Sequence, residues 1–124
     1  MTKPIKVLII DDDEDFACSL AEYVELDGHQ ADVKLTGQSG IQAARAEAYD
    51  QIMIDVVLPD MNGVGIMEAI QETTPEARIV LMTGYSAGYL DESAVNTGSV
   101  DVLTKPVDLK EVSRQLARLA AEPD

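Results

Sequence analysis

The stretch IKVLIIDDD, residues 5–13, runs from an almost unbroken apolar segment straight into three consecutive aspartates. A continuous apolar run of this length is typical of a strand that is buried on both faces of a parallel sheet. The carboxyl ends of parallel strands share one edge of their sheet, where ligands bind. Three further apolar runs also end on polar residues, which we expect at the same edge: Asp55 after residues 52–54, Thr83 after residues 79–82, and Thr104-Lys105-Pro106 after residues 100–103, a run that Asp101 interrupts.

Strand-like and helix-like segments alternate five times along the chain. Strands are expected over residues 5–10, 30–35, 51–55, 78–82 and 100–103. Helices are expected over residues 14–26, 39–48, from the turn at 58–63 to about 72, 87–96, and from a cap at Asp108 to the C-terminal apolar stripe. This alternation predicts an α/β fold, a single doubly wound, flavodoxin-like parallel sheet of five strands with helices on both faces.

A strand order of 2-1-3-4-5 explains where the polar residues fall. The second strand ends on Thr36-Gly37 and brings no charge, whereas the other four strands bring acids, a hydroxyl group and an ammonium group. This order places the first and third strands side by side at the switch point of the sheet, where such folds bind ligands.

Composition and charge restrict the function. The chain has 23 acidic and nine basic residues, for a formal charge of −14, and this field repels nucleic acid and anionic lipid. We therefore expect no direct binding of nucleic acid and no membrane contact, and no apolar run is long enough to span a bilayer. One cysteine, Cys18, and a start that lacks the features of a secretory signal favour a cytoplasmic location. We expect one domain over residues 1–124, with an ordered core at about 4–121 and a tail or linker start at 122–124.

Asp11, Asp12 and Asp55 should lie close together in this fold. Two carboxylates about 4 Å apart repel each other by roughly 4 kcal/mol at an effective dielectric constant of about 20. Shared protonation or a hard divalent cation could offset this repulsion, and Mg²⁺ fits better than zinc because no histidine or thiol is nearby in the sequence. Acids also favour the start of a helix, so residues 11–13 alone could be a solvated turn. Thr83 and Lys105 at matching strand ends favour the functional interpretation.

Five stretches carry a resemblance to a known family, and they are VLIIDD (7–12), DQIMID (50–55), LPDMNG (58–63), VLMT (80–83) and LTKP (103–106). In this order and at these separations they resemble the receiver domain of two-component response regulators along nearly the whole chain. The resemblance implies that a sensor histidine kinase, a phosphotransfer protein or a small acyl phosphate donates a phosphoryl group. It also implies a switched interaction surface that acts on a downstream output domain or target protein. The chain would catalyse only its own phosphorylation and dephosphorylation, and so would not be an enzyme in the ordinary sense.

The resemblance also implies individual roles at a Mg²⁺ site. Asp55 would be the phosphoryl acceptor and would contact the ion. Asp12 would bind Mg²⁺ directly, Asp11 mostly through water, and the backbone carbonyl of Val57 would be the third protein ligand.

The remaining roles concern the phosphoryl group itself. Lys105 would pair with its oxygens, and Thr83 would donate a hydrogen bond and move toward it. The Lys105–Pro106 bond is cis in this family. Phosphoryl transfer depends mainly on positioning and charge stabilisation, which these residues can supply. The chain departs from the family at Val102, a position that often holds a tyrosine or phenylalanine.

Two other functions use similar features. A Mg²⁺-dependent phosphatase of the haloacid-dehalogenase type needs Asp-x-Asp after the first strand, and Asp11-x-Asp13 fits formally, although the chain is short and has no room for a cap. A flavodoxin-like cofactor binder would need a loop rich in serine, threonine and glycine at that place, which acids occupy. Turnover of a phosphomonoester would distinguish the phosphatase from a receiver.

Overall fold

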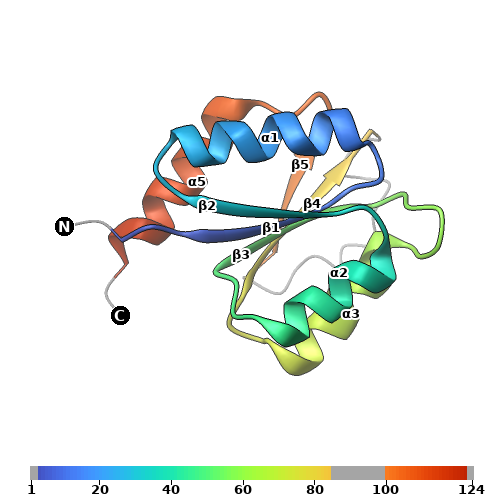
Figure 1. Cartoon of the computed structure of the whole chain (residues 1–124). Coiled ribbons are helices and arrows are strands. Elements are labelled where there is room, and N and C mark those ends of the chain that lie inside the picture. Colours follow the sequence, from blue (N-terminus) through green and yellow to red (C-terminus); the bar gives the residue numbers. More distant parts are fainter. Residues whose placement is uncertain (1–2, 85–99, 123–124) are drawn as a thin grey trace.

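One parallel sheet of five strands forms the centre of the molecule in the computed structural model, which describes residues 3–84 and 100–122 (Figure 1). The strand order is β2-β1-β3-β4-β5, so the predicted 2-1-3-4-5 topology is confirmed. The strands are β1 (Lys6–Ile10), β2 (Gln30–Lys34), β3 (Gln51–Asp55), β4 (Arg78–Thr83) and β5 (Val100–Thr104).

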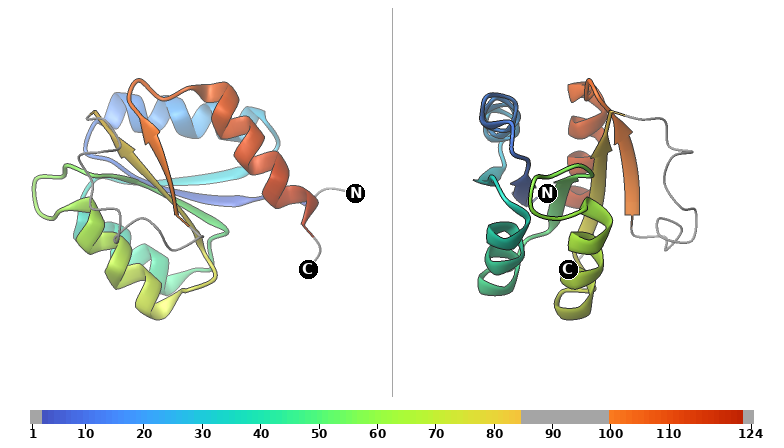
Figure 2. Two further views of the ribbon diagram at one scale, coloured as in Figure 1. Left: turned by 180° about the vertical axis from the view of Figure 1, so that it is seen from behind. Right: turned by 90° about the vertical axis from the view of Figure 1, so that its right-hand side faces the viewer.

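Helices cover both faces of the sheet, as the alternation predicts. The α1 helix (Glu14–Leu26) and the α5 helix (Leu109–Ala121) lie on one face. The α2 helix (Gly37–Ala46) and the α3 helix (Gly63–Thr73) lie on the other (Figure 2). The helix expected over residues 87–96 falls outside the described residues, so four helices are described where five were predicted.

Strand burial explains why the central strands read as continuous apolar runs. All five residues of β3 are buried, and residues 7–10 of β1 have no exposed surface. Leu8 and Ile54 belong to the core under α2 and α3, whereas Ile9 and Met53 belong to the core under α1 and α5. The edge strand β2 instead alternates between half-buried and exposed residues. Alternate side chains of a strand thus fill two cores, as expected for a sheet that is covered on both faces.

The starts of the helices follow from side-chain caps. The α1 helix begins after Asp13, whose side chain accepts a hydrogen bond from the backbone N–H of Phe16. The α2 helix begins after Thr36, which forms a reciprocal capping box with Ser39. The predicted start of this helix at Ser39 was therefore two residues too late, because Thr36 and not Gln38 or Ser39 is the cap, and its hydroxyl oxygen accepts from the N–H of Ser39. The predicted end of α2 is also two residues too late, and the other predicted bounds agree with the structure or differ from it by one residue.

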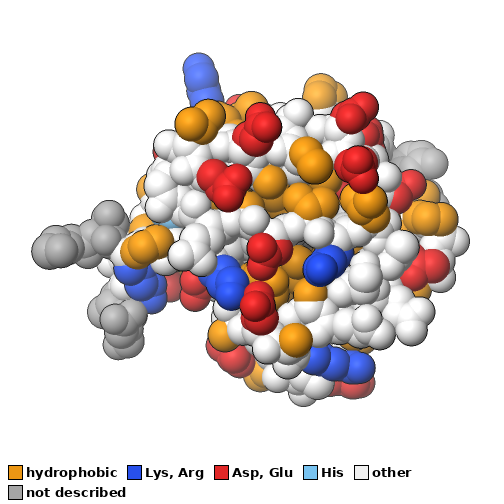
Figure 3. All heavy atoms as spheres, viewed as in Figure 1, with side chains coloured by type: hydrophobic (Ala, Val, Ile, Leu, Met, Phe, Trp, Pro, Cys, Tyr) orange, Lys and Arg blue, Asp and Glu red, His pale blue; other side chains and the backbone are white. Residues whose placement is uncertain are grey.

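The surface around α1 is rich in acidic side chains. Glu14, Asp15, Glu22 and Glu25 are all exposed, and Figure 3 shows acidic side chains across the face that carries this helix. The thiol of Cys18 also lies on the exposed side of α1. Over the ranges that the structure describes, no helix is both long enough and apolar enough to cross a bilayer.

Candidate functional site

Three of the predicted acids converge at the carboxyl edge of the sheet. Strands β1 and β3 are paired with Ile10 opposite Ile54, so Asp11, which follows β1, and Asp55, the last residue of β3, come to the same place. Asp11, Asp12 and Asp55 each offer a carboxylate oxygen, and these oxygens all lie within 4.8 Å of one another. Asp11 has no exposed surface and Asp55 is 8% exposed, whereas Asp12 faces solvent. The cluster is therefore partly buried and open on the side of Asp12.

Lys105 reaches into this acidic cluster from the end of β5. Its Nζ atom lies 2.9 Å from Oδ2 of Asp11 and 3.2 Å from Oδ2 of Asp55. The Lys105–Pro106 peptide bond is cis, as the resemblance implies. The ammonium group therefore bridges two carboxylates that come from different strands.

Thr83 is the last residue of β4 and is paired with Thr104, the residue before Lys105. Its side chain is 1% exposed, and its backbone carbonyl accepts a hydrogen bond of 2.6 Å from the backbone N–H of Lys105. The two predicted residues outside the acidic cluster are thus joined through the backbone. The structure brings Thr83 and Lys105 to the same edge as Asp11 and Asp55.

The electrostatics of the cluster leave it short of positive charge. Burial raises the pKa of Asp55, a hydrogen bond from the backbone N–H of Val57 opposes this change, and the charge of Asp11 raises the pKa further. Burial disfavours the charged form of Lys105, but its contacts with Asp11 and then Asp55 outweigh this effect and raise its pKa. Lys105 consequently stays protonated at neutral pH. One ammonium group faces three carboxyl groups, and such a site favours an additional cation.

The donor atoms of the cluster suit a hard cation. All three side chains offer carboxylate oxygen, and within the described part of the chain this group of three acids contains neither histidine nor cysteine. Oxygen ligands of this kind are preferred by Mg²⁺ and Ca²⁺, whereas zinc favours nitrogen and sulfur. The residues therefore fit the divalent cation that the sequence implies.

The loop after β3 folds tightly against the end of that strand. The backbone N–H of Val57 donates to Oδ1 of Asp55 at 3.0 Å, and Val57 pairs with Asn62 in an isolated antiparallel bridge. A Cβ atom on Gly63 would lie 2.5 Å from the carbonyl oxygen of Asp55 and 2.6 Å from Cα of Val56, so this close approach requires glycine. The carboxylate of Asp55 and the backbone of Val57 thus belong to one compact turn.

Phe16 is a neighbour of the site that sequence reasoning missed. The Nζ atom of Lys105 lies 4.9 Å from the centre of the Phe16 ring, on the first turn of α1. An ammonium group over an aromatic face gains a cation–π attraction. Phe16 lies four residues before Leu20 on the apolar stripe of α1, and helical periodicity does not separate a core side chain from one that borders a site.

Asp13 serves the helix and is not part of the acidic cluster. Its Oδ1 atom accepts from the N–H of Phe16 at 3.1 Å, and its own N–H donates to Oδ1 of Asp11 at 2.9 Å. Asp11 is meanwhile bonded to Lys105. The Asp11-x-Asp13 pair is therefore engaged in helix capping by Asp13 and in ion pairing by Asp11.

The sequence matches one known family over most of its length. The family described as the response regulator receiver domain matches residues 7–117. The chain belongs to this family. Response regulators receive phosphoryl groups from histidine kinases and act on downstream targets, and their receiver domains bind Mg²⁺ at an acidic pocket. The phosphatase and cofactor-binding alternatives have no support from these matches.

Curated relatives of the receiver domain are longer than this chain. The photosynthetic apparatus regulatory protein RegA of Rhodobacter capsulatus is 40% identical over 112 residues, covering 89% of this chain and 60% of RegA. The response regulator ArlR of Staphylococcus saprophyticus is 31% identical over 118 residues, covering 94% of this chain and 51% of ArlR. The chain thus spans between half and two thirds of these relatives.

Solved structures share the fold of this receiver domain. A two-component response regulator from Clostridium difficile has a TM-score of 0.85 and 28% identity, over 93% of this chain and 94% of that one. A response regulator from Burkholderia pseudomallei, solved with a phosphorylated aspartic acid, a calcium ion and citrate, has a TM-score of 0.82 and 28% identity, over 94% of this chain and 69% of that one.

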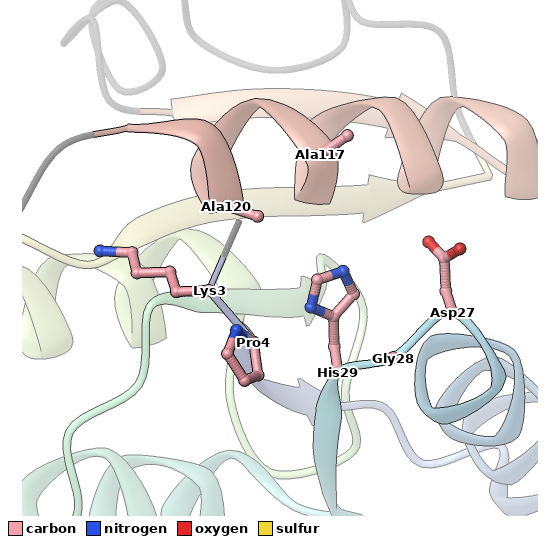
Figure 4. A pocket seen from close by; sticks show the side chains of 7 residues that line it. All are labelled: Lys3, Pro4, Asp27, Gly28, His29, Ala117 and Ala120. Atoms are coloured by element: carbon pink, nitrogen blue, oxygen red, sulfur yellow. The ribbon is translucent and has the colours of Figure 1, made fainter. Parts of the chain in front are cut away.

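A hollow of about 400 Å³ lies at the opposite, amino edge of the sheet (Figure 4). Lys3, His29, Ala117 and Ala120 are among the residues that line it. Nδ1 of His29 accepts a hydrogen bond of 2.9 Å from the backbone N–H of Ile5, just before β1. None of the acidic cluster contributes to this hollow, and the imidazole there secures the start of the sheet.

Proposed function

We propose that this receiver domain accepts a phosphoryl group on Asp55 and thereby switches a protein-interaction surface. The observation that carries the proposal is the placement of Asp55. Its carboxylate is almost buried, lies 3.2 Å from the ammonium group of Lys105, and shares a cluster with Asp11 and Asp12. A carboxylate nucleophile in such a place can form an aspartyl phosphate.

Phosphoryl transfer to Asp55 forms one bond to phosphorus and breaks another. A carboxylate oxygen of Asp55 forms the new bond to phosphorus, while the bond from phosphorus to the donor's imidazole nitrogen or acyl oxygen breaks. The leaving group departs with the electron pair of that bond. The hydrogen bond from the N–H of Val57 to Oδ1 fixes the orientation of the carboxylate, which favours an in-line approach.

Lys105 and Thr83 would stabilise the transferred group. A phosphoryl group adds up to about −2 of charge and three acceptor oxygens at one point. The ammonium group of Lys105 lies at the Asp55 carboxylate already and can pair with these oxygens. The hydroxyl group of Thr83 would donate to one of them and move toward it, and this movement would bias the neighbouring surface.

Asp11, Asp12, Asp55 and the backbone carbonyl of Val57 would hold Mg²⁺, with Asp12 as a direct ligand and Asp11 acting mostly through water. When bound, the ion supplies positive charge against the phosphoryl oxygens. Support comes from the oxygen-only donor set. It also comes from the Burkholderia pseudomallei relative, whose structure contains a phosphorylated aspartic acid and a calcium ion, which has the same preference for oxygen ligands.

The partners follow from the family and from the charge of the chain. A sensor histidine kinase or a phosphotransfer protein would be the donor, and an output domain or a separate target protein would read the switch. The formal charge of −14 argues against direct contact with nucleic acid or membrane, and the single cysteine suits a cytoplasmic location. Residues 1–124 would act as one receiver unit that catalyses only its own phosphorylation and dephosphorylation.

Phosphorylation by a small donor tests this function directly. The chain and the variant Asp55→Asn are incubated with Mg²⁺ and acetyl phosphate, and intact mass spectrometry measures the gain of one phosphoryl group. We expect the mass gain in the native chain and not in Asp55→Asn, and we expect no gain in the native chain when Mg²⁺ is left out. Equal labelling of Asp55→Asn would reject Asp55 as the acceptor. Sustained hydrolysis of p-nitrophenyl phosphate that survives Asp55→Asn and is lost in Asp11→Asn would instead indicate the phosphatase.

A further inference from the structure

Asp60 ties the loop after β3 to a helix that is distant in the sequence. Its Oδ1 atom accepts a hydrogen bond of 2.9 Å from the backbone N–H of Gly37, and its Oδ2 atom accepts one of 3.1 Å from the N–H of Gln38. These amides belong to the first turn of α2, which has free N–H groups and the positive end of the helix dipole. Both carboxylate oxygens are therefore engaged by the same helix.

The contact extends beyond the carboxylate of Asp60. The next residue, Met61, packs on Gly37 so closely that a Cβ atom there would lie 3.0 Å from its Sδ atom. The same Cβ atom would lie 2.8 Å from Cδ1 of Ile66 on α3. Gly37 thus permits the loop and α3 to approach the start of α2, and Asp60 adds two directed bonds to this contact.

Hydrogen bonds within the β3–α3 loop link its tip at Asp60 to the residues next to Asp55. Gly63 donates its backbone N–H to the carbonyl of Val56 at 2.8 Å, and Val57 pairs with Asn62. The side chain of Leu58 is 8% exposed and packs in the core under α2 and α3. A shift of the loop tip at Asp60 would therefore displace Val57, which follows the acceptor by two residues.

We propose that Asp60 is a positioning residue for the cation site, which holds Val57 in place by anchoring the β3–α3 loop to the first turn of α2. This inference rests on the proposed function, in which the carbonyl of Val57 is a ligand for Mg²⁺. Asp60 itself is not part of the acidic cluster.

The physical effect of the anchor is to reduce the freedom of the loop before the ion binds. A loop without the anchor samples more conformations, and the entropy of ordering it is then lost on binding. Mutation of a group that orients a metal ligand typically changes the metal affinity by about 10- to 100-fold. Asp60 would orient the Val57 carbonyl only through the loop, so its effect should lie at the lower end of this range. The backbone amides of Gly37 and then Gln38 lower the pKa of the Asp60 carboxyl, in agreement with two bonds that favour its charged form.

The chain offers controls that separate positioning from helix stability and from charge. Thr36→Ala removes the cap of the same helix, since Oγ1 of Thr36 accepts from the N–H of Ser39 at 3.1 Å, but it leaves the bonds to Asp60 in place. Glu68→Gln removes one exposed negative charge from the neighbouring helix α3. Asp60→Asn keeps one acceptor oxygen, and Asp60→Ala keeps none.

Isothermal titration calorimetry of the full chain with MgCl₂ tests the proposal. We expect Asp60→Ala to weaken Mg²⁺ binding by about tenfold, at the lower end of the effects known for such supporting groups, and the affinity of Asp60→Asn to lie between that of Asp60→Ala and that of the native chain. Thr36→Ala and Glu68→Gln should stay within about twofold of the native affinity, although Thr36→Ala and Asp60→Ala should lose similar thermal stability. At saturating Mg²⁺, the rate of labelling by acetyl phosphate should be near native in every variant.

Each alternative result has a defined meaning. Equal affinity in Asp60→Ala and Thr36→Ala would reduce Asp60 to a helix cap and overturn the proposal. An equal loss in Glu68→Gln would assign the effect to charge and would also overturn it. If Asp60→Ala does not fold, the affinity of Asp60→Asn decides by the same criterion. A native chain that neither binds Mg²⁺ nor accepts a phosphoryl group would reject the proposed function itself, whatever the variants do.

Discussion

The amino and carboxyl edges of the sheet differ in how their charged side chains are paired and exposed. At the amino edge, Nζ of Lys6 lies 3.0 Å from Glu47, and its backbone N–H donates to Asp50 at 2.9 Å. The hydroxyl group of Tyr49 lies 2.6 Å from Asp32 and 3.0 Å from Glu47. Each of these charged groups has a polar partner and contact with solvent.

At the carboxyl edge, by contrast, charges of one sign are crowded and partly buried. Lys105 is shared between Asp11 and Asp55, and burial together with the charge of Asp11 raises the pKa of Asp55. Such crowding costs stability unless a cation offsets it. The contrast shows that the amino edge contributes to stability, whereas the carboxyl edge retains unfavourable charge that a ligand can relieve.

The largest expected effect follows from neutralising Asp55. Asp55→Asn should abolish phosphoryl labelling and, because it removes a crowded carboxylate, raise the free energy of unfolding by about 1 to 2 kcal/mol without Mg²⁺. The raised pKa indicates the same sign, since ionised Asp55 costs stability once the pH exceeds its folded pKa. Urea denaturation at neutral pH measures the change. A less stable Asp55→Asn would show that the pairing with Lys105 outweighs the repulsion.

Addition of Mg²⁺ should relieve the same crowding in the native chain. At a concentration about ten times the dissociation constant, binding stabilises the folded state by about 1.4 kcal/mol, which raises the melting temperature by several degrees. Asp55→Asn has lost one of the three carboxylates of the cluster and should show a clearly smaller shift. Differential scanning calorimetry with a matched ionic strength of NaCl separates binding from screening. Equal shifts in both proteins would place the ion elsewhere.

Removal of the Tyr49 hydroxyl tests the amino edge. Tyr49→Phe keeps the ring, which is 5% exposed, but deletes the hydrogen bonds to the carboxylates of Asp32 and Glu47. We expect a loss of about 1 kcal/mol in the free energy of unfolding. The Mg²⁺ affinity and the labelling rate should be unchanged, and a tenfold change in either would contradict the functional separation of the two edges.

Neutralising Lys6 should have the smallest effect. Its side chain is 33% exposed and that of Glu47 is 50% exposed, so solvent screens the ion pair. Lys6→Gln should therefore lower the free energy of unfolding by no more than about 0.5 kcal/mol, and the difference should shrink in high salt. A loss above 2 kcal/mol in urea denaturation would show that this edge depends on its charges more than the exposure indicates.

Much of the carboxyl edge could be predicted from the sequence because its determinants are local. The buried runs that end on Asp11, Asp55 and Thr83 show both the strands and their terminal groups. The alternation of elements then limits the strand order, and the order brings the residues together.

Features that depend on contacts between elements were harder to predict. Thr36 was assigned to a strand end, so the start of α2 was placed too late. Phe16 fits the core stripe of α1 equally well whether or not a lysine lies over its ring. The sequence around Asp60 predicts a turn, but its two bonds go to amides more than 20 residues earlier in the chain. Only the folded arrangement of the loop and α2 reveals that contact.

The pairing of Ile10 with Ile54 means that strand register sets the positions of Asp11 and Asp55. The turn at the far edge in which Gly28 adopts a φ of 94° lies outside this pairing. Insertions and domain fusions at that turn should therefore leave the acceptor intact, whereas one residue added or deleted within β3 would redirect Asp55 to the other side of the sheet. The amino edge of the sheet should therefore tolerate more sequence change than the carboxyl edge without loss of the acidic cluster.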